Sequence, residues 1–500
     1  MPHVSSMPAN LITSPHCHAD QLGLPMPDDV HAVSACLPLW QHNIGYEEGD
    51  ASVHDRLQAA YPRFCFHPLV NQLADRFLNS GNRRGLPFVS RRSAQRAADF
   101  VQHATGEVAE LVAFDGHQAC GVVVGSDQFK TLKQYWQHAG ENVSSRVAQQ
   151  LLAGHSTACS DTAVRTVVRE RVAAFQNVEP NHVFLYPSGM AAVASAWRTV
   201  QALRPGSTCQ FGFPYVDTLK IQQRFPDASH TFLPVGGPSD LKLLEAQCEV
   251  QPPTAVICEA PTNPLLVTPD LRRLRELADQ HDFLLIVDDT LTACGNLNTT
   301  ALADIAVTSL TKYFSGYGNV LAGAMTINPN GRHAARLLEL VRSAFEETLS
   351  DVDVEVLANN SRDMPERVAT INSNAAALAD FLRSHASVQS VYYPSADDAN
   401  YTAIQAANGG YGGLISIVLR KPETTTPPFF DGLEVCKGPN LGTNFTLCCP
   451  YTILAHYDEL DFVETCGVSR WLLRISVGVE PIGELRSRFE RALNGIMLHT

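Results

Sequence analysis

The sequence contains no long hydrophobic run, because no apolar stretch approaches the ~20 residues that a membrane-spanning helix needs. Its start, MPHVSSMPANLITSPHCHADQLG, lacks both the basic region and the apolar core of a secretory signal peptide. The 13 cysteines include no CxxC pair and are irregularly spaced, which fits neither a disulfide framework nor a zinc ribbon. We therefore expect a cytoplasmic protein without a metal site.

Positive charge is also scarce. The chain has 37 Lys+Arg against 51 Asp+Glu, which leaves a formal charge of -14 at pH 7. This excess of negative charge repels nucleic-acid phosphates and anionic lipid, so we expect neither a nucleic acid nor a membrane as partner. The 500 residues are 45% hydrophobic, which is typical of a folded protein with two or three domains.

Residues 1–30 contain five prolines and no hydrophobic period, so the sequence predicts a flexible tail there. The tail includes His16-Cys17-His18, a group that could hold a soft metal ion. Since no further cluster of ligands lies nearby in the sequence, we interpret this group as part of the tail.

From residue 161 onward, short runs of branched apolar residues alternate with segments of helical period, which is typical of an α/β fold with a mainly parallel sheet. The pattern predicts strands at 182–186, 208–213, 254–259, 283–288, 305–310 and 321–327, and helices at 191–203 and 270–280. After about residue 365 it predicts a long helix, strands at 414–419 and 471–477, and a terminal helix from residue 482. We expect a large domain over residues 161–365 and a smaller α+β domain over residues 366–500.

Polar groups follow several of these strands, at the edge of the sheet where α/β proteins bind their ligands. Ser188-Gly189-Met190 follows one strand and opens a helix, whose free backbone N–H groups suit a phosphate, although an ordinary strand-to-helix turn looks the same. Asp288 ends another strand, in Ile286–Thr290. Its carboxylate could pair with a protonated pyridine nitrogen, bind a metal or cap a helix.

Two basic residues lie in similar apolar surroundings. Lys312 follows a strand directly, in Ser309–Tyr313, where partial desolvation would make its amine a nucleophile toward an aldehyde. Arg474 lies within the apolar run Leu472–Ser476 and needs a buried anion, which can be a substrate carboxylate or an acidic side chain of the protein.

Taken in this order, the segments resemble the Cys/Met-metabolism family of pyridoxal-phosphate enzymes, the cystathionine γ-synthase group. The resemblance runs from about His31 to the C-terminus and is strongest to fungal-type synthases, with stretches similar to HAVSACLPLWQHNIGYEEGD, YPRFCFHPL, YPSGMAAV, FGFPYVDTLK, EAPTNPLL, SLTKYFSG, GTNFTLCCPYTILAHY and LLRISVGVE. It implies the fold-type-I, aminotransferase-like architecture. It also implies that residues 31–160 contribute to a dimer and to the neighbouring active site.

The resemblance further implies pyridoxal 5'-phosphate as cofactor and a role for each residue of its site. Lys312 would bind the cofactor aldehyde, Asp288 would pair with the ring nitrogen, and Arg474 would hold the substrate α-carboxylate. The other residues expected around the cofactor are Tyr215, stacked on the ring, Asn263 at the ring hydroxyl, Thr290 beside Asp288, Ser188, Gly189, Met190, Ser309 and Thr311 around the phosphate, and Arg146 from the neighbouring subunit.

The chain departs from the family pattern on the side of the second substrate. Bacterial members have a tyrosine two residues before the cross-subunit arginine, where this chain has Ser144. Fungal-type synthases usually read close to SGDSNV and PSLGT, whereas this chain has Ser315–Val320, with Tyr317-Gly318, and Pro439–Thr443, with Asn440. We expect Asn440 and Tyr317 to contact the substrates, and the departures leave the second substrate open.

The activity that the resemblance implies is γ-replacement on an O-acyl-L-homoserine. Lys312 removes the α-proton, and loss of a second proton at Cβ expels the γ-acyloxy group. A nucleophile then adds to Cγ of the bound β,γ-unsaturated intermediate. Cysteine as nucleophile gives cystathionine, the transsulfuration product. Two alternatives share this machinery: a γ-lyase, and a synthase of specialised metabolism that uses a carbon nucleophile such as a β-keto acid. A non-catalytic binding protein would be expected to lack Lys312 or Asp288. We expect a homodimer or homotetramer.

Overall fold

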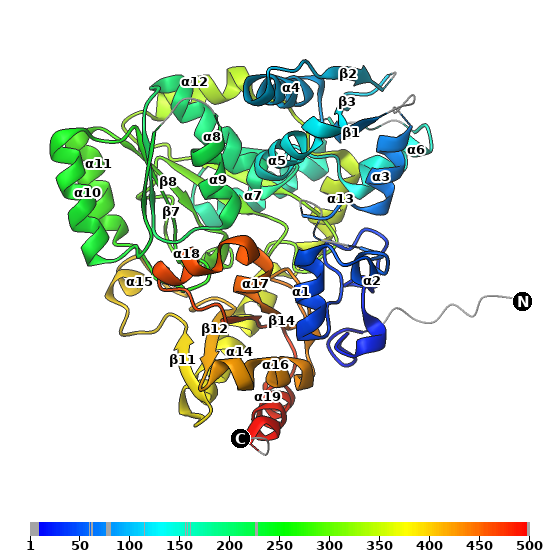
Figure 1. The fold of residues 1–500 in the computed structure, drawn as a ribbon. Coiled ribbons are helices and arrows are strands. Elements are labelled where there is room, and N and C mark those ends of the chain that lie inside the picture. Colours follow the sequence, from blue (N-terminus) through cyan, green and yellow to red (C-terminus); the bar gives the residue numbers. More distant parts are fainter. Residues whose placement is uncertain are drawn as a thin grey trace, which may run out of the picture.

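The structure is a computed structural model that describes residues 10–59, 61, 64–76, 82–114, 116–155, 157, 159–160, 162–225 and 229–497. Three sheets organise the chain, and each lies in a different part of the sequence (Figure 1). Among the described residues, no helix is both long and apolar enough to cross a bilayer.

The central sheet has seven strands in the order β4-β10-β9-β8-β7-β5-β6. Only β10 runs antiparallel to its neighbours, so the sheet is mainly parallel, as the sequence predicts. The strands are β4 (Val183–Tyr186), β5 (Thr208–Phe211), β6 (His230–Leu233), β7 (Ala255–Glu259), β8 (Leu284–Asp288), β9 (Ile305–Ser309) and β10 (Gly323–Ile327).

Helices cover both faces of this sheet, which explains why its inner strands read as continuous apolar runs. One face packs against α8, and other sheet side chains pack against α7 and α13 or against α10 and α11. The helices are α7 (Ala163–Gln176), α8 (Gly189–Leu203), α9 (Val216–Arg224), α10 (Pro238–Val250), α11 (Leu271–His281), α12 (Ala334–Ala344) and α13 (Asp351–Asn360).

The C-terminal part folds around a five-stranded sheet in the order β11-β12-β15-β14-β13. Its helix α14 begins at Met364, close to the domain boundary expected from the sequence. The strands are β11 (Val388–Tyr392), β12 (Leu414–Leu419), β13 (Cys436–Lys437), β14 (Leu447–Pro450) and β15 (Leu473–Ser476). The helices are α14 (Met364–Ser384), α15 (Ala399–Ile404), α16 (Pro422–Gly432), α17 (Tyr451–His456), α18 (Leu460–Thr465) and α19 (Ile482–Met497).

The N-terminal part contains a three-stranded antiparallel sheet, β1-β3-β2, that the sequence analysis does not predict. This sheet shares one hydrophobic core with α8 and the central sheet, so it is continuous with the large domain. Its strands are β1 (Arg83–Phe88), β2 (Glu110–Ala113) and β3 (Cys120–Gly125). The helices of this part are α1 (Trp40–Glu48), α2 (Ala51–His54), α3 (Pro68–Asp75), α4 (Arg91–Thr105), α5 (Phe129–Ala139) and α6 (Ser145–Leu152).

The prediction of a flexible tail is wrong for residues 10–30. Leu11 and Met26 are buried in a cluster with Cys36 and Phe445, and the backbone N–H of Lys437 donates to the His16 carbonyl at 3.3 Å. The apolar residues of this segment are too far apart to show a period, and several of their partners, such as Phe445, lie more than 400 residues away in the C-terminal part. Residues 1–9 lie outside the described part of the chain.

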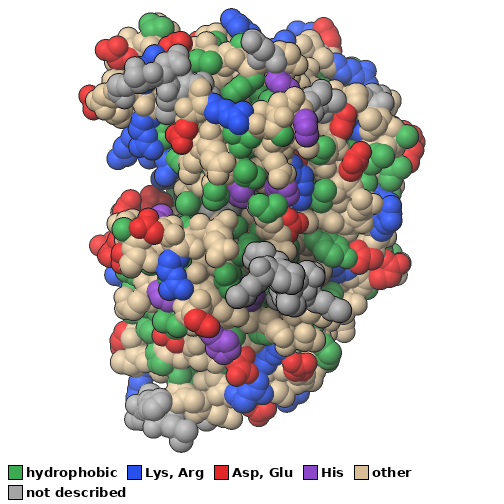
Figure 2. All heavy atoms as spheres, turned by 90° about the vertical axis from the view of Figure 1, so that its right-hand side faces the viewer, with side chains coloured by type: hydrophobic (Ala, Val, Ile, Leu, Met, Phe, Trp, Pro, Cys, Tyr) green, Lys and Arg blue, Asp and Glu red, His purple; other side chains and the backbone are tan. Residues whose placement is uncertain are grey.

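A basic patch that could bind a polyanion would be visible as clustered Lys and Arg side chains on the surface. On the face that carries the N-terminal segment, acidic and basic side chains are interspersed over the described residues (Figure 2). This distribution adds nothing in favour of a polyanionic partner.

Candidate active site

A pocket lies at the carboxyl ends of the central strands, beside the C-terminal domain, with about 1090 Å³ of empty space including its open side. All but two of the predicted site residues line it. The lining residues from that prediction are Ser188, Gly189, Met190, Tyr215, Asn263, Asp288, Thr290, Ser309, Thr311, Lys312, Asn440 and Arg474. The two that lie elsewhere are Arg146 and Tyr317.

One end of the pocket is the turn between β4 and α8. Ser188 caps α8, because its hydroxyl accepts the Ala191 N–H at 3.1 Å and donates to the Gly140 carbonyl at 2.7 Å. A Cβ on Gly189 would lie 2.8 Å from the Ser309 Cβ, so only glycine fits here. The first N–H groups of the helix have no helical partner and face the pocket, which suits a phosphate.

Thr311 is the less obvious phosphate ligand. Its hydroxyl donates to the Ala322 carbonyl at 3.3 Å and accepts the Ala322 N–H at 3.1 Å. A contact with phosphate would compete with these two bonds, whereas Ser309 lines the same pocket directly after β9. The role that the sequence assigns to Thr311 therefore stays a prediction.

Asp288 ends β8 inside the pocket. Its Oδ1 accepts the Thr290 N–H at 2.9 Å, and burial raises the pKa of its carboxyl above the ordinary value. A cationic ring nitrogen beside it would restore the ionised form, since an opposite charge at short range favours ionisation. A pyridinium ring bound in the pocket would therefore supply the positive charge that stabilises the ionised Asp288 carboxylate.

Lys312 and Arg474 are both buried and meet at Asn440. The Lys312 Nζ donates to the Asn440 Oδ1 at 2.6 Å and to the Tyr61 hydroxyl at 3.1 Å. Arg474 donates to the Asn440 carbonyl at 3.1 Å and to the Asn263 Oδ1 at 3.3 Å. One residue thus contacts both the amine and the guanidinium.

Arg474 makes no ion pair with any carboxylate of the described residues. Its Nε is buried and has no hydrogen-bond partner within that same part of the chain. Its other contacts include the ring of Tyr451, whose centre lies 4.7 Å from the guanidinium carbon, but the buried Nε remains a donor available to a ligand. Of the two readings of Arg474 that the sequence leaves open, this geometry favours a substrate carboxylate over an internal acid.

The sequence analysis missed Glu259, the last residue of β7. It pairs in register with Asp288, so the search for polar groups at strand ends would have found it. Its Oε1 accepts the Tyr215 N–H at 2.5 Å and so fixes the start of α9. Burial and the neighbouring Asp288 raise the pKa of Glu259 well above the ordinary value, which favours the protonated form of its carboxyl.

This raised pKa predicts a pH-dependent effect of Glu259→Gln on the apoprotein. A carboxyl that is protonated when folded and ionised when unfolded makes the protein less stable as the pH rises. Glu259→Gln removes that penalty and keeps an acceptor for the Tyr215 N–H. We expect its melting temperature, relative to the wild type, to be higher at pH 8 than at pH 5.

Glu259→Ala is the matched control, since it leaves the Tyr215 N–H without its acceptor. It should destabilise the fold by about 1–3 kcal/mol at both pH values. A Glu259→Gln protein that loses stability at pH 8 would show that this carboxyl is ionised.

Aromatic residues of the N-terminal part also line the pocket and were not predicted as site residues. They are Tyr46, Tyr61 and Phe64. Tyr61 lies in the stretch YPRFCFHPL, and the Lys312 Nζ lies 4.5 Å from the centre of its ring. That stretch is one of those that resemble the family. Its own residue pattern, however, does not indicate a contact with a lysine 251 residues away.

Arg146 and Tyr317 lie outside the pocket of their own chain. Arg146 is buried at the start of α6, with its Nη1 3.4 Å from Asp353 and its Nη2 3.9 Å from Asp29. Tyr317 is 37% exposed, and its ring lies 5.6 Å from the Arg367 guanidinium carbon. The expected contact of Tyr317 with substrate and the expected reach of Arg146 to a neighbouring subunit both stay predictions.

Comparisons with known proteins agree with this geometry. Residues 135–494 match the family described as Cys/Met metabolism PLP-dependent enzyme, and residues 67–144 match the fungal trans-sulfuration enzyme N-terminal domain. A cystathionine gamma-synthase of Neurospora crassa is 34% identical, with 95% of this chain and 98% of that protein covered. A cystathionine gamma-synthase-like enzyme of Amanita muscaria, iboG2, is 31% identical, with 94% and 96% covered.

The fold is also shared with solved structures. A cystathionine gamma synthase from Xanthomonas oryzae pv. oryzae aligns with a TM-score of 0.60 at 23% identity, covering 68% of this chain and 87% of that one. This likeness confirms the predicted fold-type-I architecture. From the sequence match and the pocket together, the chain belongs to the Cys/Met metabolism family of PLP-dependent enzymes, with pyridoxal 5'-phosphate as its cofactor.

Proposed function

We propose that this enzyme catalyses γ-replacement on an O-acyl-L-homoserine, with cysteine as the first candidate nucleophile. The observation that carries the proposal is the pairing of Lys312 and Arg474 across Asn440 in one buried pocket. When the carboxylate of an amino acid substrate pairs with Arg474, the α-carbon of that substrate lies toward the Lys312 amine. The similarity to the Neurospora crassa cystathionine gamma-synthase supports the same reaction.

Each residue has a separate task in this reaction. Bound pyridoxal phosphate supplies an electron sink for the bond that breaks at Cα. The Lys312 amine accepts the α-proton and returns a proton later, and Asp288 holds the ring nitrogen in its charged form. Arg474 orients the amino acid through its carboxylate. Apolar side chains of the lining, Leu291, Leu321, Leu454 and Ala455, limit the access of water.

The proposal is tested by acyl release from O-acetyl-L-homoserine with and without cysteine. We expect cysteine to divert the carbon skeleton into cystathionine. A protein that forms 2-oxobutyrate and ammonia at an unchanged rate with cysteine present is a γ-lyase. Release of no acetate under either condition would contradict the proposal.

Arg474→Lys tests the carboxylate contact. The lysine keeps the positive charge but loses the two parallel donors of the guanidinium. We expect KM for the homoserine ester to rise by about tenfold or more, while the visible spectrum of the bound cofactor stays the same. Loss of the cofactor or of the fold, measured by absorbance and circular dichroism, would indicate a structural arginine instead.

A carbon nucleophile is the second candidate, and Asn440 is the observation that favours it. Its amide lies beside Lys312, where fungal-type synthases are expected to have serine, and its Nδ2 is buried without a partner among the described residues. An unpaired buried donor can bind a carbonyl oxygen of a β-keto acid.

Asn440→Ser is therefore expected to shift the ratio of cysteine to carbon-nucleophile products severalfold toward cysteine, while acetate release stays within about tenfold of wild type. Tyr317→Phe is the matched control, because Tyr317 lies outside the pocket of its chain. Product ratios come from mass spectrometry with cysteine and acetoacetate present together. An unchanged ratio for Asn440→Ser would remove the case for a carbon nucleophile.

We also propose that the enzyme is a homo-oligomer with composite sites. The N-terminal part supplies three aromatic side chains to the pocket, whereas Arg146, which the resemblance assigns to a neighbouring subunit's site, is buried beside Asp353 outside the pocket of its own chain. Closed symmetry is the usual arrangement for such assemblies. Sedimentation equilibrium measures whether the holoenzyme is a dimer or a tetramer, and a monomer would contradict this proposal.

A further inference from the structure

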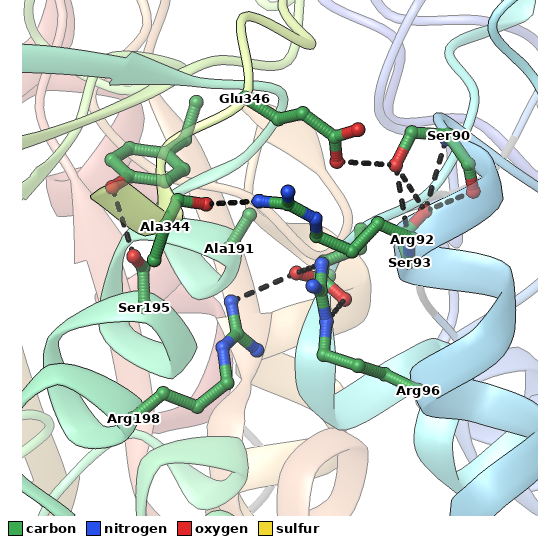
Figure 3. A network of polar contacts seen from close by, with 12 residues as sticks. Ser90, Arg92, Ser93, Arg96, Ala191, Ser195, Arg198, Ala344 and Glu346 are labelled. Atoms are coloured by element: carbon green, nitrogen blue, oxygen red, sulfur yellow. Dashed lines mark hydrogen bonds and ion pairs between the residues drawn. The ribbon is translucent and has the colours of Figure 1, made fainter. Parts of the chain in front are cut away.

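A second pocket lies between the N-terminal part and the large domain, with about 900 Å³ of empty space including its open side. It is formed by α4, α8 and the end of α12, and it shares no lining residue with the catalytic pocket. Its charged lining residues are Arg92, Arg96, Arg198, Glu141 and Glu346. The three guanidinium groups and the Glu346 carboxylate face one another across the space (Figure 3).

Both carboxylate oxygens of Glu141 have partners within the protein. Its Oε1 lies 2.6 Å from Arg96 and 2.8 Å from Arg198, and its Oε2 accepts the Tyr135 hydroxyl at 3.0 Å. Burial opposes its ionisation, but Arg198 and Arg96 outweigh this, so the pKa of Glu141 lies below its ordinary value. Glu141 is therefore charged and neutralises one of the three arginines.

Glu346, the second acidic residue of the pocket, has a hydrogen-bond partner for one of its oxygens. The Glu346 Oε2 accepts the Ser90 hydroxyl at 2.7 Å, and Glu346 makes no ion pair with an arginine of the described residues. Three guanidinium groups against two carboxylates leave one positive charge in the pocket. This excess stands out in a chain whose formal charge is -14.

Arg198 and Arg92 have guanidinium N–H groups that could bind a ligand. The Nη1 of Arg198 is buried and has no hydrogen-bond partner within the described part of the chain. Arg92 uses its Nη1 on the Ala344 carbonyl at 2.9 Å and lies exposed at the mouth of the pocket (Figure 3). Unpaired buried donors are unfavourable unless a ligand completes them, and an oxyanion matches the guanidinium geometry.

The rest of the wall is partly apolar and partly lined by hydroxyl side chains, those of Ser195, Thr199, Ser343 and Thr348. Val89, Leu340 and Phe345 line the pocket, and the Tyr186 and Phe345 rings meet edge to face with centroids 5.5 Å apart. A concave space of this size that combines apolar side chains with polar and charged groups can hold a small organic molecule, and such sites often lie between domains.

We propose that this pocket binds a small organic anion, whose carboxylate or phosphate group contacts Arg198 and Arg92 and whose apolar part packs against Phe345. The site also adjoins the cofactor site. Tyr186, Pro187 and Ala191 line this pocket, while the residues between them, Ser188 to Met190, line the catalytic pocket. A ligand here contacts the phosphate-binding turn from its other side.

The test uses the holoenzyme, in which the cofactor already fills the catalytic phosphate site. Succinate and inorganic phosphate are titrated separately by calorimetry at constant ionic strength. We expect saturable binding of at least one probe at one site per chain, and the probe that binds distinguishes a carboxylate from a phosphate ligand. Arg92→Ala should weaken that binding by about tenfold or more, because a charged hydrogen bond is lost.

Arg91→Ala is the matched control, since Arg91 is an exposed neighbour on α4 that does not line the pocket. It should leave the affinity within about twofold. Arg198→Gln should also weaken binding, and Glu141 then keeps Arg96 and Tyr135 as partners. The absence of saturable binding for both probes would overturn the proposal. So would an affinity that Arg92→Ala leaves unchanged, which would place the anion elsewhere, for example at Arg474.

Discussion

Lys312→Ala is expected to give a protein in which sodium borohydride no longer fixes the cofactor to the chain. Lys312 is the only lysine among the described residues that line the pocket, and its Nζ lies within hydrogen-bond distance of Asn440 and Tyr61. The same amine is proposed to move the α-proton. We therefore expect turnover to fall by at least ~10³-fold, toward the upper range for loss of a general base.

The control for this experiment is a second buried lysine. The Lys437 Nζ donates to the backbone carbonyls of Pro38 and Asp431, away from the pocket. Lys437→Met should lower stability but leave the borohydride-fixed cofactor on Lys312, which peptide mapping identifies. Fixed cofactor in the Lys312→Ala protein would contradict the assignment of the lysine.

Asp288→Asn is expected to have the second largest effect. The carboxylate is proposed to keep the ring nitrogen protonated, and an amide of the same shape cannot do this by charge. We expect kcat/KM to fall by at least ~10²-fold, as for the loss of other preorganised electrostatic contacts in active sites. The absorbance spectrum of the bound cofactor should also change.

Asp289 provides the matched control, since it is an adjacent, buried carboxylate. Its carboxylate accepts hydrogen bonds from Gln176 at 2.6 Å and Thr299 at 3.1 Å, and it does not line the pocket. Asp289→Asn should reduce the melting temperature and leave kcat/KM within about tenfold. Equal losses of activity in the two variants would show that Asp288 acts through the fold.

The sequence predicts the central sheet well because local patterns determine it. The buried strands are runs of branched residues, and each of the six strands predicted for this sheet contains an observed one. The polar groups that follow them, such as Asp288 and Lys312, converge because parallel strands end at one edge. The edge strand β6 was missed because its short sequence, with His230 and Thr231, is half exposed and has no apolar run.

The N-terminal contributions could not be predicted in the same way. The segment around Leu11 packs against residues more than 400 positions away, and Tyr61 contacts Lys312, which lies 251 residues further along the chain. Such contacts depend on tertiary packing, which periodicity does not report. Tyr317 lies outside the pocket of its own chain with its ring beside Arg367, so its expected contact with substrate stays a prediction.

The central claim is that the enzyme replaces the acyloxy group of an O-acyl-L-homoserine at Cγ. Its most direct test offers the holoenzyme O-acetyl- or O-succinyl-L-homoserine together with cysteine, sulfide and acetoacetate, and identifies all products by mass spectrometry. The account predicts a product in which one nucleophile is bonded to Cγ, with cystathionine as the main species, and its loss in Lys312→Ala. Recovery of the homoserine ester unchanged, or conversion only at the α-carbon as in racemisation, would contradict it.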